Sequence, residues 1–155
     1  MKIPPGIEDG TQIRLSGEGE AGNQGGPPGD LFCIVHVAPH PAFVRRGGDL
    51  YAEIPVRYSQ LALGGRAEVV TLRGSASVTI PRGTPNGKIL RMRGQGLPRF
   101  QGEGRGDLLV RVYVDVPGKL TAREEELLKE LEEIGRREAP KRQRGFFEKV
   151  KDIFD

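Results

Sequence analysis

Two stretches of the sequence decide the fold. Residues 79–114 read TIPRGTPNGKILRMRGQGLPRFQGEGRGDLLVRVYV, and residues 2–37 read KIPPGIEDGTQIRLSGEGEAGNQGGPPGDLFCIVHV. Aligned without gaps at an offset of 77 residues, the two stretches share 14 of 36 positions, many of them glycines. Glycine is selected where the backbone geometry requires it, so the shared pattern predicts that one supersecondary unit is used twice.

The repeat is incomplete at its first copy. A strand-rich stretch, residues 49–78, precedes the second copy and carries turn signals at Gly64-Gly65 and Gly74, whereas no such stretch precedes the first. We therefore predict a whole second module over residues 46–118 and the distal half of a first module over residues 1–45. We also expect the chain to be a fragment of a longer protein.

The strand pattern differs between the two copies. Val110, Val112 and Val114 alternate with Arg111 and Tyr113, which is the period-two pattern of a half-buried strand. The equivalent stretch of the first copy is apolar on both faces, so both faces are covered or one is a binding surface. The sequence predicts a mostly β fold, with two repeated antiparallel β-sandwich-like modules (the first only partly present) followed by C-terminal helices.

A helical tail is predicted over residues 119–155. Thr121 and Glu124 form a capping box, and Gly135 is expected to end the helix that follows. Pro140 acts as a breaker before a second amphipathic stretch of about ten residues, which is too short to be stable alone in water. That stretch must dock on its own domain, on a second copy or on a membrane surface.

Composition excludes several classes of protein. The 155 residues contain one cysteine, so neither an internal disulfide nor a multi-cysteine zinc site is possible. The formal net charge is only +3, and no apolar run reaches the roughly 18 residues of a membrane-spanning helix. Residues 1–6 have no apolar signal core, which leaves secretion unsupported.

No catalytic motif stands out. Gly17-x-Gly19-x-x-Gly22 spells a dinucleotide fingerprint, but Pro27-Pro28 follows where the motif needs a helix, so we interpret it as a loop. Asp30 and Asp107 occupy equivalent positions of the repeat and are interpreted as turn residues rather than as a pair of acids. Cys33 lacks a nearby base and orienting group in sequence, so we do not expect an enzyme.

A basic cluster lies in the predicted tail and has two interpretations. Nucleic acid or acidic lipid is one possible partner, and a solvated linker is the other. An acidic run beginning at Glu124 precedes the cluster and favours the linker. The cluster consists of Arg136, Arg137, Lys141, Arg142 and Arg144.

A specific resemblance rests on the segment His40-Pro41-x-Phe43-x-Arg45-x-Gly47-x-Asp49-Leu50. This segment resembles the junction between the two C-terminal β domains of DnaJ-type co-chaperones. The match continues through Ile80-Pro81-x-Gly83-Thr84 and Gly106-Asp107-Leu108, and the ending from Gly145 to Phe154 resembles the tail of bacterial members.

Departures from the family define what the resemblance implies. The J domain, the Gly/Phe linker and the cysteine-rich zinc repeats are not in this sequence, and His40-Pro41-Ala42 is not the His-Pro-Asp signature. No zinc or other cofactor is therefore expected in this chain. The resemblance implies a cytoplasmic co-chaperone fragment that binds unfolded polypeptides and forms a homodimer. Joined to a J domain, it would act with a DnaK-type chaperone in protein folding and the heat-shock response, without nucleic acid or membrane as partner.

The same resemblance assigns two groups of site residues. The client-peptide site comprises Ile13, Leu15, Leu31, Cys33 and Val35, for which an ordinary core role is an equal alternative. The dimerisation site comprises Leu127, Leu128, Leu131, Ile134, Phe146, Phe147, Val150, Ile153 and Phe154, and the first four are expected to pack on the second β module or on a partner chain. Two alternative functions stay open: a self-associating structural β module, and a basic nucleic-acid-binding module without chaperone activity.

Overall fold

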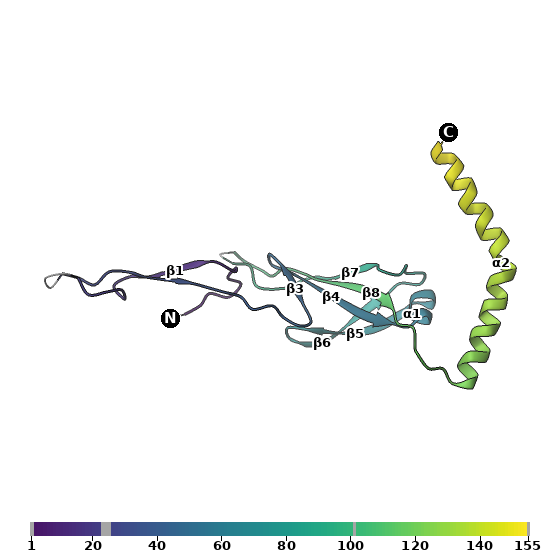
Figure 1. The fold of residues 1–155 in the computed structure, drawn as a ribbon, viewed down its shortest axis with the longest axis horizontal. Helices are drawn as coiled ribbons and strands as arrows, with labels where there is room; N and C mark the ends of the chain where they lie inside the picture. The colour runs from purple at the N-terminus through teal and green to yellow at the C-terminus, as the bar shows by residue number, and fades with distance from the viewer. Residues whose placement is uncertain (1, 23–25, 101, 155) are drawn as a thin grey trace. The chain divides into compact units, whose positions relative to one another are not determined.

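The computed structural model describes residues 2–22, 26–100 and 102–154, and the side chains up to residue 138. The chain divides into two units, Met1–Asp115 and Val116–Asp155, which are treated separately below. The first unit holds every described strand, and the second holds a long helix (Figure 1). The predicted mostly β fold is confirmed.

The described strands of the first unit form three sheets. A two-stranded sheet pairs β1 (Gln12–Leu15) with β2 (Leu31–Ile34). A four-stranded sheet has the order β3-β4-β8-β7, and a hairpin forms a third sheet, β5-β6. The bounds are β3 Val44–Arg46, β4 Asp49–Val56, β5 Gly65–Thr71, β6 Gly74–Ile80, β7 Ile89–Met92 and β8 Leu108–Val114.

The second module is a two-layer sandwich. Leu108, Val110 and Val112 on one face of β8 are fully buried. Leu108 and Val110 pack in one cluster with Val69 and Val78 of the β5-β6 hairpin, and Val112 packs in a second cluster with Leu61 of the short helix α1 (Tyr58–Leu63). The alternation predicted for β8 is confirmed up to Val114, whereas Val116 is 79% exposed and lies beyond the strand.

One pairing differs from the antiparallel pairing that the sequence predicts. β4 and β8 run parallel, in register from Leu50↔Leu108 to Val56↔Val114. The chain between them passes through α1, the β5-β6 hairpin and β7, which provides the long crossover connection that parallel pairing requires. β3 pairs with only the first residues of β4, so Pro55 lies where no described strand pairs with the other edge of β4.

The structural repeat extends to individual hydrogen bonds. β1 and β2 pair in the register Ile13↔Cys33, and β7 and β8 pair as Leu90↔Val110, which is the same register moved by 77 residues. Backbone bonds recur at the same offset. They are Gly10 N to Val35 O and Gly87 N to Val112 O, both 2.8 Å, and Gly19 N to Gly29 O and Gly96 N to Gly106 O, at 2.8 and 2.9 Å.

In each copy of the repeat, an aspartate just before the last strand accepts the same pair of hydrogen bonds, and this arrangement is called here the carboxylate corner. Asp30 accepts hydrogen bonds from the Arg14 side chain and from the Gly17 amide. Asp107 accepts the equivalent bonds from Arg91 and from Gly94. The Gly94 amide and the Arg91 guanidinium hold the pKa of Asp107 below its usual range. The interpretation of both aspartates as turn residues therefore has a specific basis in hydrogen bonding.

Arg45 joins the first module to the second. Its guanidinium donates to the carbonyl oxygens of Gly6 and Ile7 at 2.8 and 2.7 Å, and to the oxygen of Gly47 at 2.9 Å. Gly6 has φ +79°, and a Cβ atom there would lie 2.3 Å from the Pro98 oxygen. The N-terminal segment thus reaches the second module through a contact that only glycine permits.

The tail is one helix, α2 (Ala122–Phe154), and not two. The predicted end at Gly135 is wrong: Glu132–Arg136 and Glu133–Arg137 ion pairs, at 2.7 and 3.2 Å, span that position. A glycine inside a helix costs only about 1 kcal/mol. The helix also continues through Pro140, and its axis bends near the middle (Figure 1), as expected where proline removes one backbone bond.

Two equivalent leucines provide a test of the core. Leu108→Ala removes a fully buried side chain, so we expect a loss of about 2–5 kcal/mol in the free energy of unfolding. Leu31→Ala, at the same position of the first copy, removes a side chain that is 43% exposed, and should cost less than about 1 kcal/mol. Urea denaturation of the full chain measures both, and equal losses would contradict the assignment of the core.

The Asp107 corner gives a second test. Because the folded state lowers this pKa, the ionised carboxylate stabilises the fold fully above the unfolded pKa of about 4. That stabilisation is lost as the pH falls through the folded pKa. Asp107→Asn should therefore lower the urea midpoint at pH 7 and flatten its decline between pH 5 and pH 3. Asp115→Asn, at an exposed position, is the control and should leave the decline unchanged.

Candidate functional site

The β1-β2 pair brings the five predicted client-binding residues onto one face. Ile13 lies opposite Cys33 and Leu15 opposite Leu31, and directly opposed residues of antiparallel strands project to the same side. Val35 follows two positions after Cys33, and its amide donates to the Thr11 oxygen at 2.9 Å, which continues the pairing. The five residues therefore form one apolar patch, called here the β1-β2 face.

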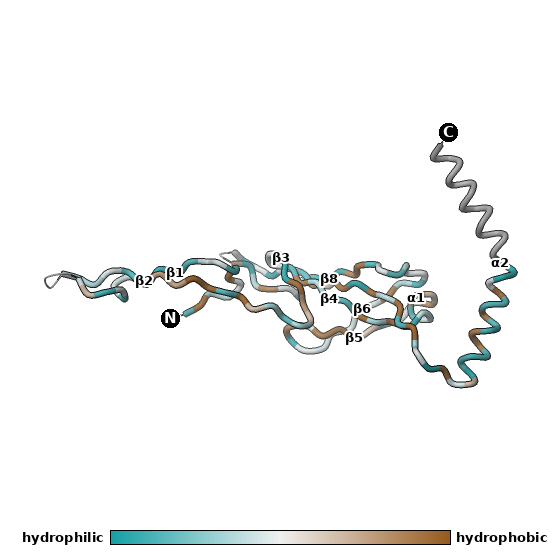
Figure 2. The backbone as a smooth tube through the Cα atoms, in the orientation of Figure 1, coloured by the Kyte–Doolittle hydropathy of each residue, from teal (hydrophilic) through white to brown (hydrophobic). Residues whose placement is uncertain are grey.

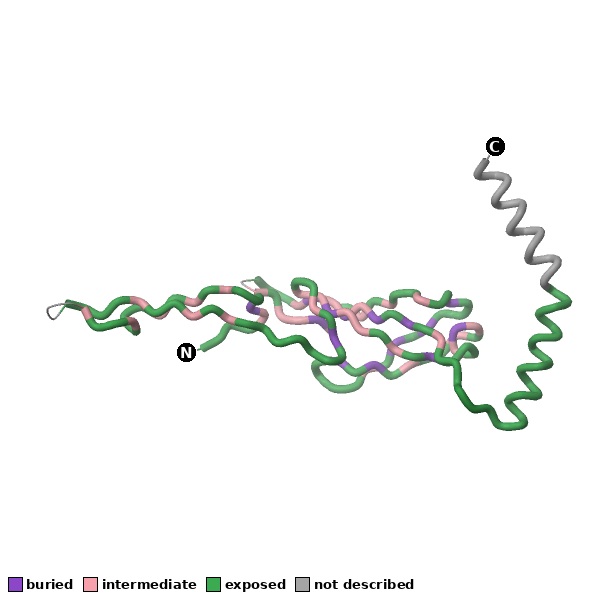
Figure 3. Tube along the Cα trace, viewed as in Figure 1, coloured by how far each residue is buried: buried purple, intermediate pink, exposed green. Residues whose placement is uncertain are grey.

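The β1-β2 face is incompletely covered. Leu31 is 43% exposed, and the other four side chains are half-buried. Their equivalents 77 residues later are core residues of the second module, and Leu108, Val110 and Val112 among them are fully buried. The difference has a visible cause, since the β5-β6 hairpin packs on the second copy and no described element takes that place on the first (Figure 3).

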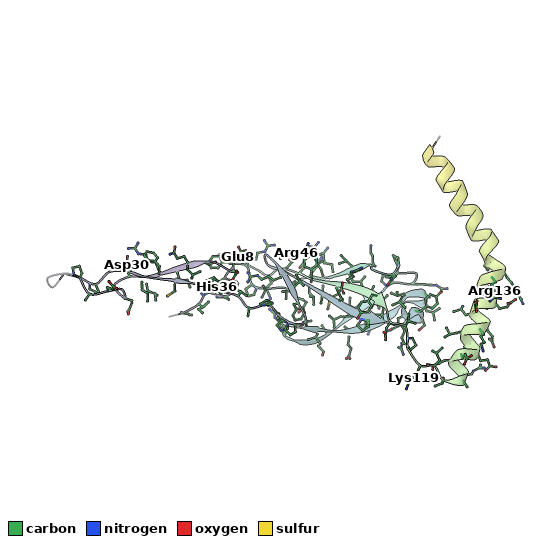
Figure 4. All side chains as sticks on the ribbon, viewed as in Figure 1. Glu8, Asp30, His36, Arg46, Lys119 and Arg136 are labelled. Carbon is green, nitrogen blue, oxygen red and sulfur yellow. The ribbon has the colours of Figure 1, made fainter. Side chains whose placement is uncertain are left out.

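The opposite face of β2 carries two residues that sequence reasoning did not select. Phe32 and Ile34 are 53% and 60% exposed. The available signal was the run of apolar residues on both faces of this strand, which Figure 2 shows as brown along β2. Arg14 lies directly opposite Phe32 on β1 and forms its ion pair with Asp30, the residue before β2 that is labelled in Figure 4.

The outer edge of β2 is open. Among the described strands, β2 pairs only with β1, whereas its equivalent β8 lies between β7 and β4. The Val35 amide points toward β1, so by alternation the backbone groups of Phe32 and Ile34 point away from it. An unpaired edge of this kind can accept another strand by backbone hydrogen bonding.

Other candidate residues form no chemical site in the described part of the chain. The described residues contain no group of three His, Cys, Asp or Glu side chains arranged to hold a metal ion. His36 faces Asp9 at 3.7 Å, and His40 accepts a hydrogen bond from the Ala42 amide. The described residues after Gly22 begin no helix before β2, in agreement with the interpretation of the Gly17–Gly22 motif as a loop.

The tail presents an apolar stripe on α2. Leu127, Leu128, Leu131 and Ile134 are between 44% and 58% exposed. The helix begins as predicted: the Thr121 amide and hydroxyl donate to Glu124, and these bonds lower the pKa of the Glu124 carboxyl. The remaining predicted dimerisation residues lie outside the described side chains: Phe146, Phe147, Val150, Ile153 and Phe154.

The basic cluster is partly neutralised within the same helix. Arg136 and Arg137 pair with Glu132 and Glu133, while the side chains of Lys141, Arg142 and Arg144 lie outside the described set. Over the residues that were searched, no helix combines the length and the hydropathy that a bilayer crossing demands.

Comparison with known proteins identifies both parts of the chain. The DnaJ C terminal domain family matches residues 1–117, and the family described as Chaperone protein DnaJ C-terminal region matches residues 123–155. Proteins named Chaperone protein DnaJ from Sinorhizobium fredii and Rhizobium meliloti are each 48% identical over the whole chain. A protein of the same name from Ruminiclostridium cellulolyticum is 44% identical over 99% of the chain.

These relatives are longer than the chain, which covers 41% of each of the three. The match extends across the repeated β modules and the helical tail, and it includes the segment around Arg45 on which the resemblance rests. The chain therefore belongs to the DnaJ C-terminal domain family.

Proposed function

We propose that this chain binds non-native polypeptides, as the client-binding and self-associating part of a DnaJ-type co-chaperone. The observation that carries the proposal is the partly exposed β1-β2 face beside the open edge of β2. The names of the relatives, all chaperone proteins, support it. The chain holds clients and catalyses no reaction.

Binding of this kind follows from what unfolded chains expose. A non-native segment presents apolar side chains together with unpaired backbone groups. The β1-β2 face offers apolar area to the side chains, and the outward backbone groups of Phe32 and Ile34 offer hydrogen bonds to the main chain. Backbone pairing does not depend on sequence, so the surface suits many different clients.

The proposed partner is a DnaK-type chaperone, which receives clients from the complete cytoplasmic co-chaperone in protein folding and the heat-shock response. The chain contributes client capture to this exchange. Structural self-association without client binding, and nucleic-acid binding, are the competing functions. Pairing of Arg136 and Arg137 with glutamates weakens the nucleic-acid alternative, since paired charges attract phosphate less strongly.

We propose further that α2 mediates homodimerisation. Leu127, Leu128 and Leu131 fall on one stripe of the helix at positions where side chains three and four residues apart are neighbours. An exposed leucine stripe of this kind is stabilised by packing against a second helix. Two linked client sites then bind a long unfolded chain more tightly than one site does.

A matched pair of leucines tests client binding. Leu31 and Leu72 are both 43% exposed, but only Leu31 lies on the β1-β2 face. We expect Leu31→Gln to reduce the suppression of light scattering from an aggregating client several-fold at equal chain concentration, and Leu72→Gln to leave it near the unsubstituted level. Equal suppression by the two variants would refute the proposed site. If the unsubstituted chain did not suppress light scattering at all, the proposed function would be refuted.

A second matched pair tests dimerisation. Leu131 on α2 and Leu120 before the helix are both 44% exposed. Leu131→Asp places a charge in the stripe and should convert the dimer to a monomer at low micromolar concentration, whereas Leu120→Asp should not. Light scattering coupled to size exclusion measures the mass, with deletion of residues 119–155 as reference. A monomeric unsubstituted chain would exclude the proposed dimer.

A further inference from the structure

The four-stranded sheet of the second module has an outer face, opposite the β5-β6 hairpin, that carries an apolar row. Core residues of β8 such as Leu108 and Val110 alternate with residues that project to this face. Val44, Tyr51 and Leu109 lie directly opposite one another on β3, β4 and β8, so they form one row across three strands. Val44 is 63% exposed, and Tyr51 and Leu109 are half-buried. The solvent face of a sheet is ordinarily polar, so this row needs an explanation.

A hollow of about 520 Å³ lies over this row and is called here the outer hollow; residues of β3, β4, β7, β8 and of the segment 40–43 line it. The rings of His40 and Phe43 lie 5.0 Å apart in that segment, and Phe43 is buried. Ile89 of β7, another lining residue, is 48% exposed. The volume falls within the roughly 300–1,000 Å³ of pockets that hold ligands. Because several lining side chains are exposed, the outer hollow suits a segment lying across the sheet better than an enclosed small molecule.

The charges in the outer hollow favour an anionic partner. Arg46, labelled in Figure 4, holds its guanidinium 5.0 Å from the centre of the Tyr51 ring, and within the described residues no carboxylate pairs with it. Arg111 pairs with Glu53 at 2.9 Å between β8 and β4, and both side chains are more than half exposed. With His40 neutral, the lining has an excess of one positive charge. An arginine that stacks on an aromatic ring keeps its N–H groups free to bind a carboxylate.

The repeat shows that the fold does not require this pattern of charge. At the offset of 77 residues, Ile34 is the equivalent of Arg111 and Gln12 is the equivalent of Ile89. The first copy therefore forms the same strand pair without the arginine. The glycines and the carboxylate corner recur in both copies, whereas the side chains of the outer hollow belong to the second module alone, which indicates a role beyond folding.

We propose that the outer hollow binds an acidic-apolar segment of a partner protein, in which a carboxylate lies next to a side chain of the size of leucine or phenylalanine. The apolar side chain packs on the row of Val44, Tyr51 and Leu109, and the carboxylate pairs with Arg46. Glu53 repels a dense run of phosphates, so a peptide fits better than nucleic acid. The site shares no residue with the β1-β2 face, and it requires a carboxylate that client binding does not.

The test uses the full chain and a fluorescein-labelled peptide, GSEFDELGS, in which three carboxylates flank a phenylalanine and a leucine. Fluorescence anisotropy should report saturable binding in 50 mM NaCl, and binding several-fold weaker in 300 mM NaCl, because salt screens exposed charges. The peptide GSQFNQLGS replaces the carboxylates with amides and should bind at least fivefold more weakly. Tighter binding of a ten-nucleotide oligothymidylate than of the acidic peptide would overturn the proposal in favour of nucleic acid.

Matched variants of the chain locate the site. Val44 and Val70 are 63% and 64% exposed, but only Val44 lines the outer hollow. Val44→Ser should weaken peptide binding at least threefold, and Val70→Ser should leave it unchanged. Arg46→Gln should weaken binding at least fivefold, with Arg66→Gln, at an exposed position of β5, as its control. Glu53→Gln removes the carboxylate of the outer hollow and should tighten binding about twofold, a gain that a damaged fold would not produce.

Suppression of client aggregation separates this site from the proposed client site. Leu31→Gln should leave binding of the acidic peptide unchanged, and Val44→Ser should leave suppression unchanged. Equal binding of the acidic and amide peptides, or loss of peptide binding in Leu31→Gln but not in Val44→Ser, overturns the present proposal and leaves client binding intact. Carboxylate-dependent peptide binding by a chain that suppresses no aggregation supports the outer hollow and refutes the client-binding function.

Discussion

The carboxylate corner at Asp107, with its counterpart at Asp30, is the interaction on which the β architecture depends. One carboxylate oxygen accepts the amide of a glycine 13 residues earlier, and the other accepts an arginine on the neighbouring strand. This closes the glycine-rich loop and fixes where the following strand begins. In the second copy the backbone of the same aspartate also pairs with Asp49 and Leu50, so one residue aligns three strands.

Most of the repeat was predictable because its determinants are local. Glycines such as Gly6 and Gly83, both with positive φ, require a particular residue at a particular place, and that requirement repeats in the sequence. The alternation along β8 reports burial directly. The helix start at Thr121 was predictable for the same reason, since a capping box involves residues only three positions apart.

Other features depend on distant residues and leave no periodic signal. The parallel pairing of β4 with β8 joins segments 58 residues apart, and neither strand's own pattern reports its direction. The six-residue helix α1 is too short for its period to stand out. Gly135 marks a helix end in isolation, but the flanking ion pairs carry the helix past it. The resemblance assigned the five residues of the β1-β2 face to one client site, but the pattern of β2, apolar on both sides, could not distinguish a binding surface from a covered core.

Pro55 has a consequence for the behaviour of the protein at high concentration. Among the described strands, none pairs with the later part of β4 on the side of β3. The Leu50 amide points toward β8, so by alternation the nitrogen of residue 55 points to that other side. Proline has no N–H to donate there, which prevents an extended segment from forming a continuous ladder of backbone hydrogen bonds along this edge. The edge of β4 at Pro55 therefore cannot serve as a second acceptor for continuous strand pairing, which limits polymerisation of the protein through its sheets.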